Sequence, residues 1–192
     1  TVIDLTDGDR SAFLSWISGA QVRIGFNDEQ RWRGHYYTQV VPSVPGVRHR
    51  IDRDLSALKL LGVHASERSP RLCLTGEDEA RADELLGRLG IRRDRPIAII
   101  QPGARYWFKA WPYERFAELA CRLASDYGCQ VLIGGSREEE ALAQQIREAA
   151  KGCPISMAGL ATLKQFAAIA KRAALFVGND SGAMHIAAAV GT

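Results

Sequence analysis

Short apolar runs alternate along this chain with longer segments in which apolar residues recur every three or four positions. The short runs predict strands, and the longer spacing predicts amphipathic helices. In the first half, this pattern predicts strands at Val2–Leu5 and Val22–Phe26 and helices at Asp9–Ile17, His49–Leu61 and Asp78–Leu89. Residues 27–47 have no clear period and contain aromatic, proline and arginine residues, so we expect a long functional loop there.

The alternation becomes regular after a charged connector that ends at Pro96. Strands are predicted at "IAIIQ", "CQVLI", "PISM" and "ALFV", with a helical segment after each one. This order predicts an α/β fold with parallel sheets, and strands so apolar are expected to be buried on both faces. We place a domain boundary in the connector, which divides the chain into residues 1–92 and 93–192.

Three loops follow the predicted strands of the second domain: "QPGARYWFKAWP", "GGSREEE" and "GNDSG". Ligands of parallel α/β sheets bind beyond the carboxyl ends of the strands. We therefore expect the three loops to line one crevice.

The loop "GNDSG" opens an apolar, buried helix. Asp180 or Ser181 can cap this helix, and Gly182 lets a ligand approach the backbone. Since a helix N-terminus attracts anions, the loop either only caps the helix or holds a phosphate. His185 lies one turn further on and is either a core residue or a ligand contact.

The other two loops offer charged groups. Lys109 stands among aromatic residues, with Arg105 close before it, and both are either solvated or bound to a diphosphate. Ser136 and Glu139 have the spacing of a capping box, which accounts for Glu139 without a ligand. Glu138 is free to accept hydrogen bonds from ribose hydroxyls.

Composition and missing motifs argue against several classes of protein. The net charge of +3 is too small to indicate nucleic-acid binding, and no apolar run approaches the length of a membrane span. The chain lacks a Walker A motif, a dinucleotide-binding glycine fingerprint and a hydrolase nucleophile elbow. Its four cysteines lack zinc-site spacing, so we expect reduced thiols in a cytoplasmic protein. The chain opens in a strand without Met and stops after a helix, which we interpret as cuts through a larger protein.

The segments "PGARYWFKAWPYERFAELA", "VLIGGSREEE" and "VGNDSGAMHIAAAVGT" resemble, in order and spacing, the heptosyltransferases of glycosyltransferase family 9, including the heptosyltransferase III type. "VIDLTDGDRSAFLSWISGAQVRIGF" is similar to the later part of that family's acceptor domain. The resemblance implies a GT-B fold of two Rossmann-like domains, both incomplete here. It also implies inverting transfer of heptose from ADP-heptose to a hydroxyl of the lipopolysaccharide inner core. No cofactor or metal is implied, and the location would be cytoplasmic, with room for a peripheral contact at the inner membrane.

The resemblance further implies roles for individual residues. Lys109 and the Ser181–Gly182 helix start would neutralise the diphosphate, and Asp180 would contact the heptose or order the phosphate loop. Glu138, or its neighbour Glu139, would bind the ribose. The remaining donor-site residues implied are Gly103, Ala104, Arg105 and His185. Ala104 and Arg105 replace two threonines that touch phosphate in the family, a departure for which the Arg105 charge could compensate. The family's catalytic base would lie upstream of residue 1, so this chain alone is expected to be inactive.

Arginines gather in the first domain, where the acceptor would bind, and they indicate either a surface for a phosphorylated sugar or a solvated basic face. They are Arg10, Arg23, Arg31, Arg33, Arg48 and Arg50, of which Arg10, Arg31 and Arg33 are our candidates for acceptor contacts. Two alternative functions stay open: another GT-B enzyme, such as a UDP-sugar transferase or an epimerase, and a nucleotide-sugar-binding fragment without catalysis. A Rossmann oxidoreductase is disfavoured by the missing fingerprint.

Overall fold

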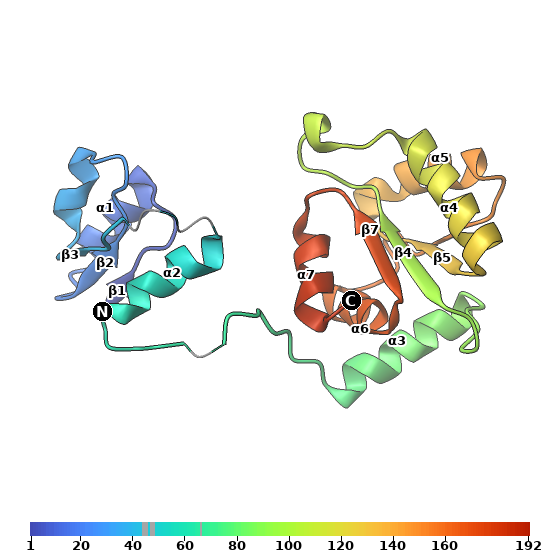
Figure 1. Cartoon of the computed structure of the whole chain (residues 1–192), viewed down its shortest axis with the longest axis horizontal. Coiled ribbons are helices and arrows are strands. Elements are labelled where there is room, and N and C mark those ends of the chain that lie inside the picture. Colours follow the sequence, from blue (N-terminus) through green and yellow to red (C-terminus); the bar gives the residue numbers. More distant parts are fainter. Residues whose placement is uncertain (44–45, 47–48, 66) are drawn as a thin grey trace. The chain divides into compact units, whose positions relative to one another are not determined.

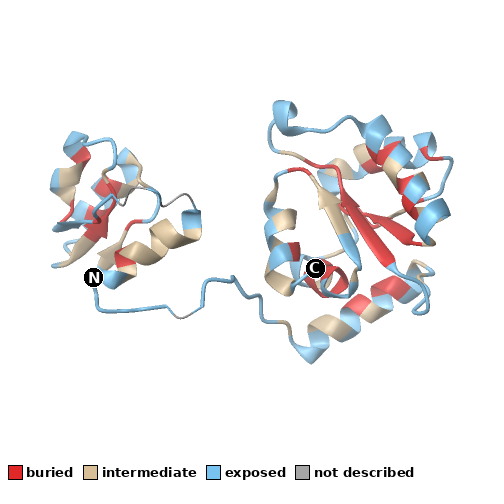
Figure 2. Cartoon of the chain, viewed as in Figure 1, coloured by how far each residue is buried: buried red, intermediate tan, exposed pale blue. Residues whose placement is uncertain are grey.

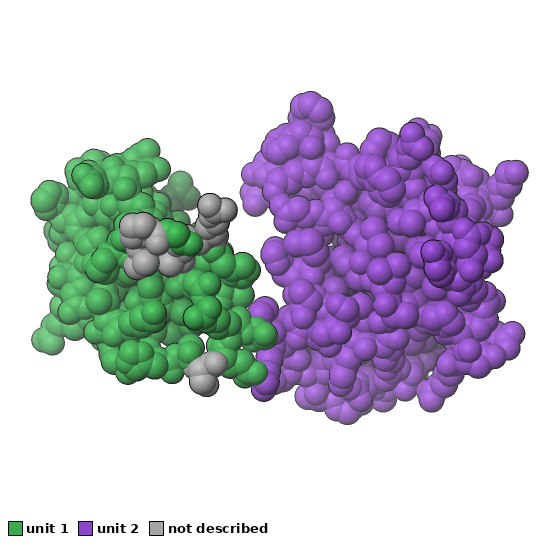
Figure 3. Space-filling view, viewed as in Figure 1, with its two compact units in different colours: residues 1–69 green, residues 70–192 purple. Residues whose placement is uncertain are grey.

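A computed structural model of the chain describes residues 1–43, 46, 49–65 and 67–192. These residues form two compact units, Thr1–Ser69 and Pro70–Thr192 (Figure 3). The division lies before α3 (Gly76–Arg88), whereas the sequence placed it after residue 92. The reason is that α3 packs its apolar face, including Leu85, into the core of the second unit, and Lys171 bonds to its Glu79 at 2.8 Å.

The first unit is a small α/β unit with a parallel sheet in the order β1-β2-β3. Its strands are β1 (Val2–Ile3), β2 (Arg23–Gly25) and β3 (Gln39–Val40). Its helices are α1 (Asp9–Ile17), the 3₁₀ helix η1 (Trp32–Tyr36) and α2 (Arg50–Lys59). The sequence did not predict η1 and β3 within residues 27–47, because elements this short leave no periodic signal.

The second unit is a parallel sheet between two layers of helices (Figure 1). The strand order is β6-β5-β4-β7, with β4 (Ile97–Gln101), β5 (Gln130–Ile133), β6 (Ile155–Ser156) and β7 (Leu175–Gly178). The helices are α3, α4 (Tyr113–Tyr127), α5 (Glu140–Ala149), α6 (Leu163–Arg172) and α7 (Gly182–Val190), with 3₁₀ turns η2 (Trp107–Lys109) and η3 (Arg137–Glu139). The α/β fold with parallel sheets is therefore confirmed in both units.

Strand β4 divides the core of the second unit between the two faces of the sheet. Ala98 and Ile100 belong to the cluster with α4 and α5, while Ile97 and Ile99 belong to the cluster with α3, α6 and α7. All residues of β4 and β5 are buried, as the apolar runs predicted (Figure 2). The same prediction is wrong for β7, a strand at the end of the sheet whose Leu175 is exposed. The helix after "GNDSG" was predicted to be buried, and this prediction is also wrong. Of the residues of α7, all of which the structure describes, only Ala187 is buried.

The strand order creates the crevice that the sequence predicted. From β4 the chain moves outward to β5 and β6, and then returns to the other side of β4 for β7. A switch point of this kind leaves a gap between the two loops that follow β4 and β7. The loop with Lys109 and the loop with Asp180 therefore start at adjacent strand ends.

Candidate functional site

Asn179 holds the two loops of the switch point together. Its buried side chain donates to the carbonyl oxygen of Pro102 at 2.7 Å and accepts from the backbone N–H of Trp111 at 3.1 Å. These bonds reach both ends of the segment that carries Lys109. The sequence reasoning missed this role, although a polar residue between a buried strand and a helix start was its signal.

Lys109 and Asp180 meet at this point. The Lys109 ammonium donates a hydrogen bond to the Asp180 carboxylate, and both side chains are partly exposed. Chiefly because of this hydrogen bond and the Lys109 charge, the pKa of Asp180 is below its usual value. The structure thus brings together Lys109 and Asp180, which lie on two different predicted loops.

Ser181 occupies the N-cap position of α7 without capping it. Its side chain makes no cap hydrogen bond, and its hydroxyl oxygen is buried without a hydrogen-bond partner in the described structure. Since the Asp180 carboxylate is bonded to Lys109, the prediction that one of these two side chains caps the helix is wrong. A buried hydroxyl without a partner costs free energy, and a ligand oxygen would remove that cost.

The second loop is ordered by Glu139. The predicted capping box is confirmed: Ser136 and Glu139 bond to each other's backbone N–H, with Glu139 at 2.7 Å from the nitrogen of Ser136. The same carboxylate lies against Gly103, where a Cβ atom would come within 1.7 Å of it. Glu139 therefore fixes the β4 loop relative to the β5 loop. Glu138 is exposed beside it, with a pKa lowered chiefly by a hydrogen bond from Ser136.

An apolar pocket of about 550 Å³ opens next to the start of α7. Its lining is Gln101, Gly135, Ser136, Met157, Ala161, Thr162, Leu163, Phe166, Gly182, Ala183 and Ile186. The pocket reaches from the first residues of α7, beside Ser181, to the start of α6, where Thr162 forms a capping box with Gln165. Flat apolar groups fit such a lining, with Ser136 and Gln101 as polar contacts. Of these residues, the sequence pointed to Gly182 as a ligand contact and to Ser136 as a cap.

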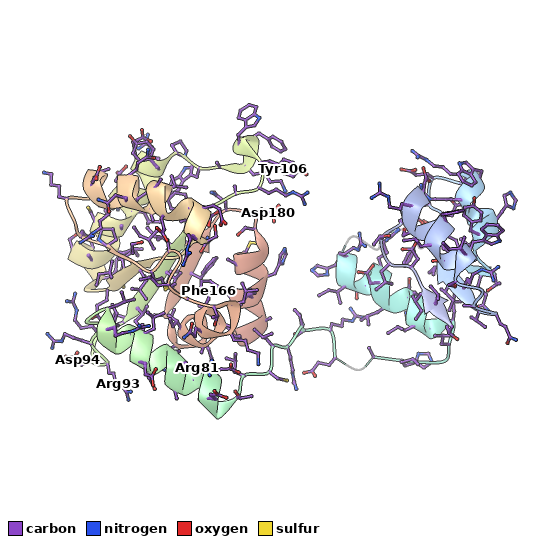
Figure 4. All side chains as sticks on the ribbon, turned by 180° about the vertical axis from the view of Figure 1, so that it is seen from behind. Arg81, Arg93, Asp94, Tyr106, Phe166 and Asp180 are labelled. Atoms are coloured by element: carbon purple, nitrogen blue, oxygen red, sulfur yellow. The ribbon has the colours of Figure 1, made fainter. Side chains whose placement is uncertain are left out.

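The remaining predicted donor-loop residues lie where the β4 loop leaves the sheet. Gly103 is buried, Ala104 is half-buried and Arg105 is exposed. The Arg105 guanidinium lies 5.5 Å from the ring centroid of Tyr106. Figure 4 shows Tyr106 and Asp180 at the same end of the unit, away from Arg93 and Asp94.

In the first unit, Arg33 differs from its predicted place on an exposed basic surface. Its side chain is 3% exposed and bonds to Asp7 at 2.9 Å and to Asp9 at 3.0 Å. Glu29 lies 3.4 Å from it. Arg33 is therefore a structural residue of this unit, because its charge is already bound by carboxylates.

The other two acceptor candidates are on the surface. Arg31 is exposed and pairs with Glu29 at 2.5 Å, and Arg10 is exposed on the first turn of α1. Arg48 lies outside the described residues.

Within residues 1–43, 46, 49–65 and 67–192, no helix combines the length and the apolar character needed to cross a membrane. The same residues contain no group of three His, Cys, Asp or Glu side chains placed to hold a metal ion. The absence of a metal from the reaction stays an expectation.

Comparison with known proteins gives consistent matches over the whole chain. The family model described as "Glycosyltransferase family 9 (heptosyltransferase)" matches residues 1–192. Lipopolysaccharide heptosyltransferase 3 of Escherichia coli is 30% identical over 100% of this chain and 56% of its own length. Lipopolysaccharide core heptosyltransferase OpsX of Haemophilus influenzae is 25% identical over 100% of the chain and 54% of its own length. The chain thus spans little more than half the length of these curated relatives.

Solved structures agree with this result. A glycosyltransferase family 9 protein from Veillonella parvula superposes with a TM-score of 0.83 at 25% identity, over 100% of this chain and 55% of that one. E. coli heptosyltransferase WaaC with ADP-2-deoxy-2-fluoro heptose has a TM-score of 0.68 at 24% identity, covering 98% of this chain and 58% of that one. These similarities confirm the predicted GT-B fold.

Proposed function

The chain belongs to glycosyltransferase family 9, and from this premise we propose that its second unit binds the nucleotide-sugar donor of a heptosyltransferase. The donor is ADP-heptose, and the reaction is an inverting transfer of heptose to a hydroxyl of the lipopolysaccharide inner core. A relative of this family has been solved with an ADP-heptose analogue, and the relatives that match over the whole chain are named as lipopolysaccharide heptosyltransferases.

One observation carries the proposal: the Ser181 hydroxyl is buried without a partner at the N-terminus of α7, between Lys109–Asp180 and the apolar pocket. The adenine ring fits the pocket, where Met157 and Phe166 supply apolar contacts. The diphosphate then lies at the helix N-terminus, where Ser181 donates to a phosphate oxygen. Lys109 exchanges its bond to Asp180 for a phosphate oxygen, and Asp180 becomes free to contact the heptose.

This arrangement supports catalysis through the leaving group. As the acceptor hydroxyl attacks the anomeric carbon, negative charge accumulates on the departing ADP. Lys109 and the α7 N-terminus stabilise that charge, because a cation and a helix dipole favour anions more as their charge grows. Glu138, exposed beside Ser136 at the pocket edge, binds the ribose hydroxyls, while Glu139 stays in its capping box. Arg105 offers a second cation to the diphosphate.

The first unit binds the acceptor, and Arg10 and Arg31, two of its exposed arginines, bind the acceptor's phosphate groups. The enzyme works in the cytoplasm, at the cytoplasmic face of the inner membrane. The proton of the acceptor hydroxyl goes to a base that we do not assign to any residue of this chain.

Calorimetric titration of the 192-residue chain with ADP, UDP, UDP-N-acetylglucosamine and NAD tests the donor site. We expect ADP to bind, with UDP and NAD at least tenfold weaker. Lys109→Ala should lower the affinity for ADP at least tenfold, equivalent to about 1.4 kcal/mol of binding free energy. Preference for the uridine ligands would identify a different GT-B enzyme. No ADP binding by a folded sample would contradict a donor site in this chain.

A further inference from the structure

Three aromatic side chains project from the loop that carries Lys109. We call Tyr106, Trp107 and Phe108 the aromatic turn. Trp107 is 87% exposed, Phe108 64% and Tyr106 46%. Soluble proteins usually bury aromatic rings of this size, so three consecutive exposed rings on a short turn indicate a binding surface.

The aromatic turn is ordered without a ligand. The Tyr106 and Phe108 rings stack with centroids 5.3 Å apart and planes 14° from parallel. The Trp107 ring stands edge-on to Phe108, at 6.0 Å. The backbone N–H of Lys109 donates to the Tyr106 carbonyl at 3.0 Å, which closes the turn. A binding surface fixed in advance loses little conformational entropy when a ligand arrives.

A neighbouring residue, Trp111, anchors this loop although its ring stays 45% exposed. Trp111 folds back onto Phe116 of α4, with ring centroids 5.0 Å apart, and its backbone N–H bonds to Asn179. The loop is therefore anchored on one side of Lys109 by Trp111 and presents exposed rings on the other. The exposure of the aromatic turn is a property of this position rather than of a loose loop.

The place of the aromatic turn beside the proposed donor site indicates which kind of ligand it binds. Lys109 belongs to the same 3₁₀ turn as Trp107 and Phe108, and its ammonium is bonded to Asp180. Figure 4 shows Tyr106 and Asp180 at the same end of the unit. In the proposed donor site, Lys109 and Asp180 face the junction between the diphosphate and the sugar. A group next to Lys109 therefore meets a sugar ring before it meets the nucleotide.

We infer that the aromatic turn is a sugar-binding platform of the transferase site, on which Trp107 stacks against the C–H face of a pyranose ring. This inference rests on the proposed function. Aromatic faces carry partial negative charge and sugar C–H groups are weakly positive, so stacking leaves the sugar hydroxyls free at the ring edge for polar contacts. The sugar comes either from the donor or from the acceptor, and both present the same chemistry to the ring.

Trp107→Ala, measured by calorimetry, tests the inference and separates the two sources. Tyr127→Ala is the matched control, since Tyr127 is 72% exposed at the last residue of α4, before the amino end of β5. Three ligands are titrated: ADP, ADP-heptose, and a lipid-free inner-core oligosaccharide in the presence of saturating ADP. The ADP affinity of Trp107→Ala should stay within twofold of the wild type, which also shows that the variant folds.

If the platform holds the donor sugar, Trp107→Ala lowers the affinity for ADP-heptose at least fivefold and leaves the affinity for the oligosaccharide unchanged. If the platform holds the acceptor sugar, the affinity for the oligosaccharide falls at least fivefold and the affinity for ADP-heptose does not. Unchanged affinity for both, with ADP bound normally, overturns the inference and leaves the donor site standing. Reduced binding to anionic phospholipid vesicles without a sugar effect also overturns it, and would identify a membrane contact. A wild-type chain that fails to bind ADP overturns the proposed function and this inference together.

Discussion

The ammonium of Lys109 is bonded to the carboxylate of Asp180 across the switch point of the second sheet. This ion pair joins the loop after β4 to the loop after β7, and Asn179 adds backbone bonds on both sides of it. Both charged side chains remain partly exposed, so the pair can open for a ligand. The free protein therefore keeps its main cation at the site neutralised until an anion replaces the carboxylate.

Lys109→Ala should raise the pKa of Asp180 toward the ordinary aspartate value, because the lowered value arises chiefly from the Lys109 hydrogen bond and charge. Since the folded pKa is lowered, any stability from this pair is present above the ordinary pKa and is lost as the pH falls through the folded value. Carboxyl-carbon NMR titration measures the change. Lys164→Ala is the control, as Lys164 pairs with Asp78 instead. An unshifted Asp180 in Lys109→Ala would show that the pair does not persist in solution.

Ser181→Ala should leave the melting temperature unchanged or raise it slightly, because the hydroxyl is buried without a partner and makes no cap bond. The same variant should bind ADP several-fold more weakly, since it removes a phosphate contact. Thr162→Ala is the matched control: Thr162 does cap α6, so its loss should cost about 1 kcal/mol of stability. Calorimetric melting and titration give both quantities. A large loss of stability in Ser181→Ala would contradict the assignment of the hydroxyl to a ligand.

Gly103→Ala should lower both the melting temperature and the affinity for ADP. The added methyl would lie 1.7 Å from the Glu139 carboxylate, which must then leave its capping box and release the β5 loop. Gly87→Ala is a contrasting control inside α3, where an added Cβ meets nothing within 4 Å. That substitution should stabilise the chain by up to about 1 kcal/mol, because alanine is the better helix former. Equal melting temperatures for the two variants would show that Glu139 moves aside freely.

Periodicity and motif spacing in the sequence were enough to predict the buried strands and one capping box of the second unit. The apolar runs located β4 and β5, and the Ser136–Glu139 spacing identified a real capping box. The same reasoning left open whether Ser181 or Asp180 only caps the helix or belongs to a phosphate site, because sequence cannot show that Lys109, distant in the chain, binds the Asp180 carboxylate. The carboxylates that bind Arg33 were not predictable for the same reason, whereas the position of Asn179 showed a polar role but not its partners. The apolar pocket also required the fold, since α6, α7 and the β5 loop contribute to it together.

Tyr37→Phe should change how the stability of the first unit depends on pH. The buried Asp4 carboxylate accepts a hydrogen bond from the Tyr37 hydroxyl at 2.7 Å and another from the Thr6 backbone at 2.9 Å. Burial by itself raises the pKa of Asp4, but hydrogen bonds from side chains and from Thr6 outweigh it and lower the pKa. Burial and the bond to Asp4 raise the pKa of Tyr37.

The two shifts act at opposite ends of the pH scale. The lowered pKa of Asp4 gives stability that is present above about pH 4 and is lost as the pH falls through the folded value. The raised pKa of Tyr37 gives stability that is present below about pH 10 and is lost as the pH rises toward the folded value. In Tyr37→Phe the alkaline loss disappears. The acid loss still begins near pH 4, but it is smaller and is complete at a higher pH, because Asp4 has one donor fewer and its folded pKa rises toward the unfolded value.

At neutral pH the same substitution should lower the free energy of unfolding by about 1–3 kcal/mol, the cost of leaving a buried acceptor without its donor. The phenylalanine ring keeps the contact that Tyr37 makes with Gly25, where an added Cβ would lie 2.2 Å from the ring. The loss therefore reports the hydroxyl rather than the packing. Melting curves from pH 3 to pH 11 measure the profile, with Tyr127→Phe as an exposed control that should match the wild type. A Tyr37→Phe profile parallel to that of the wild type would show that the Asp4–Tyr37 bond does not contribute to stability.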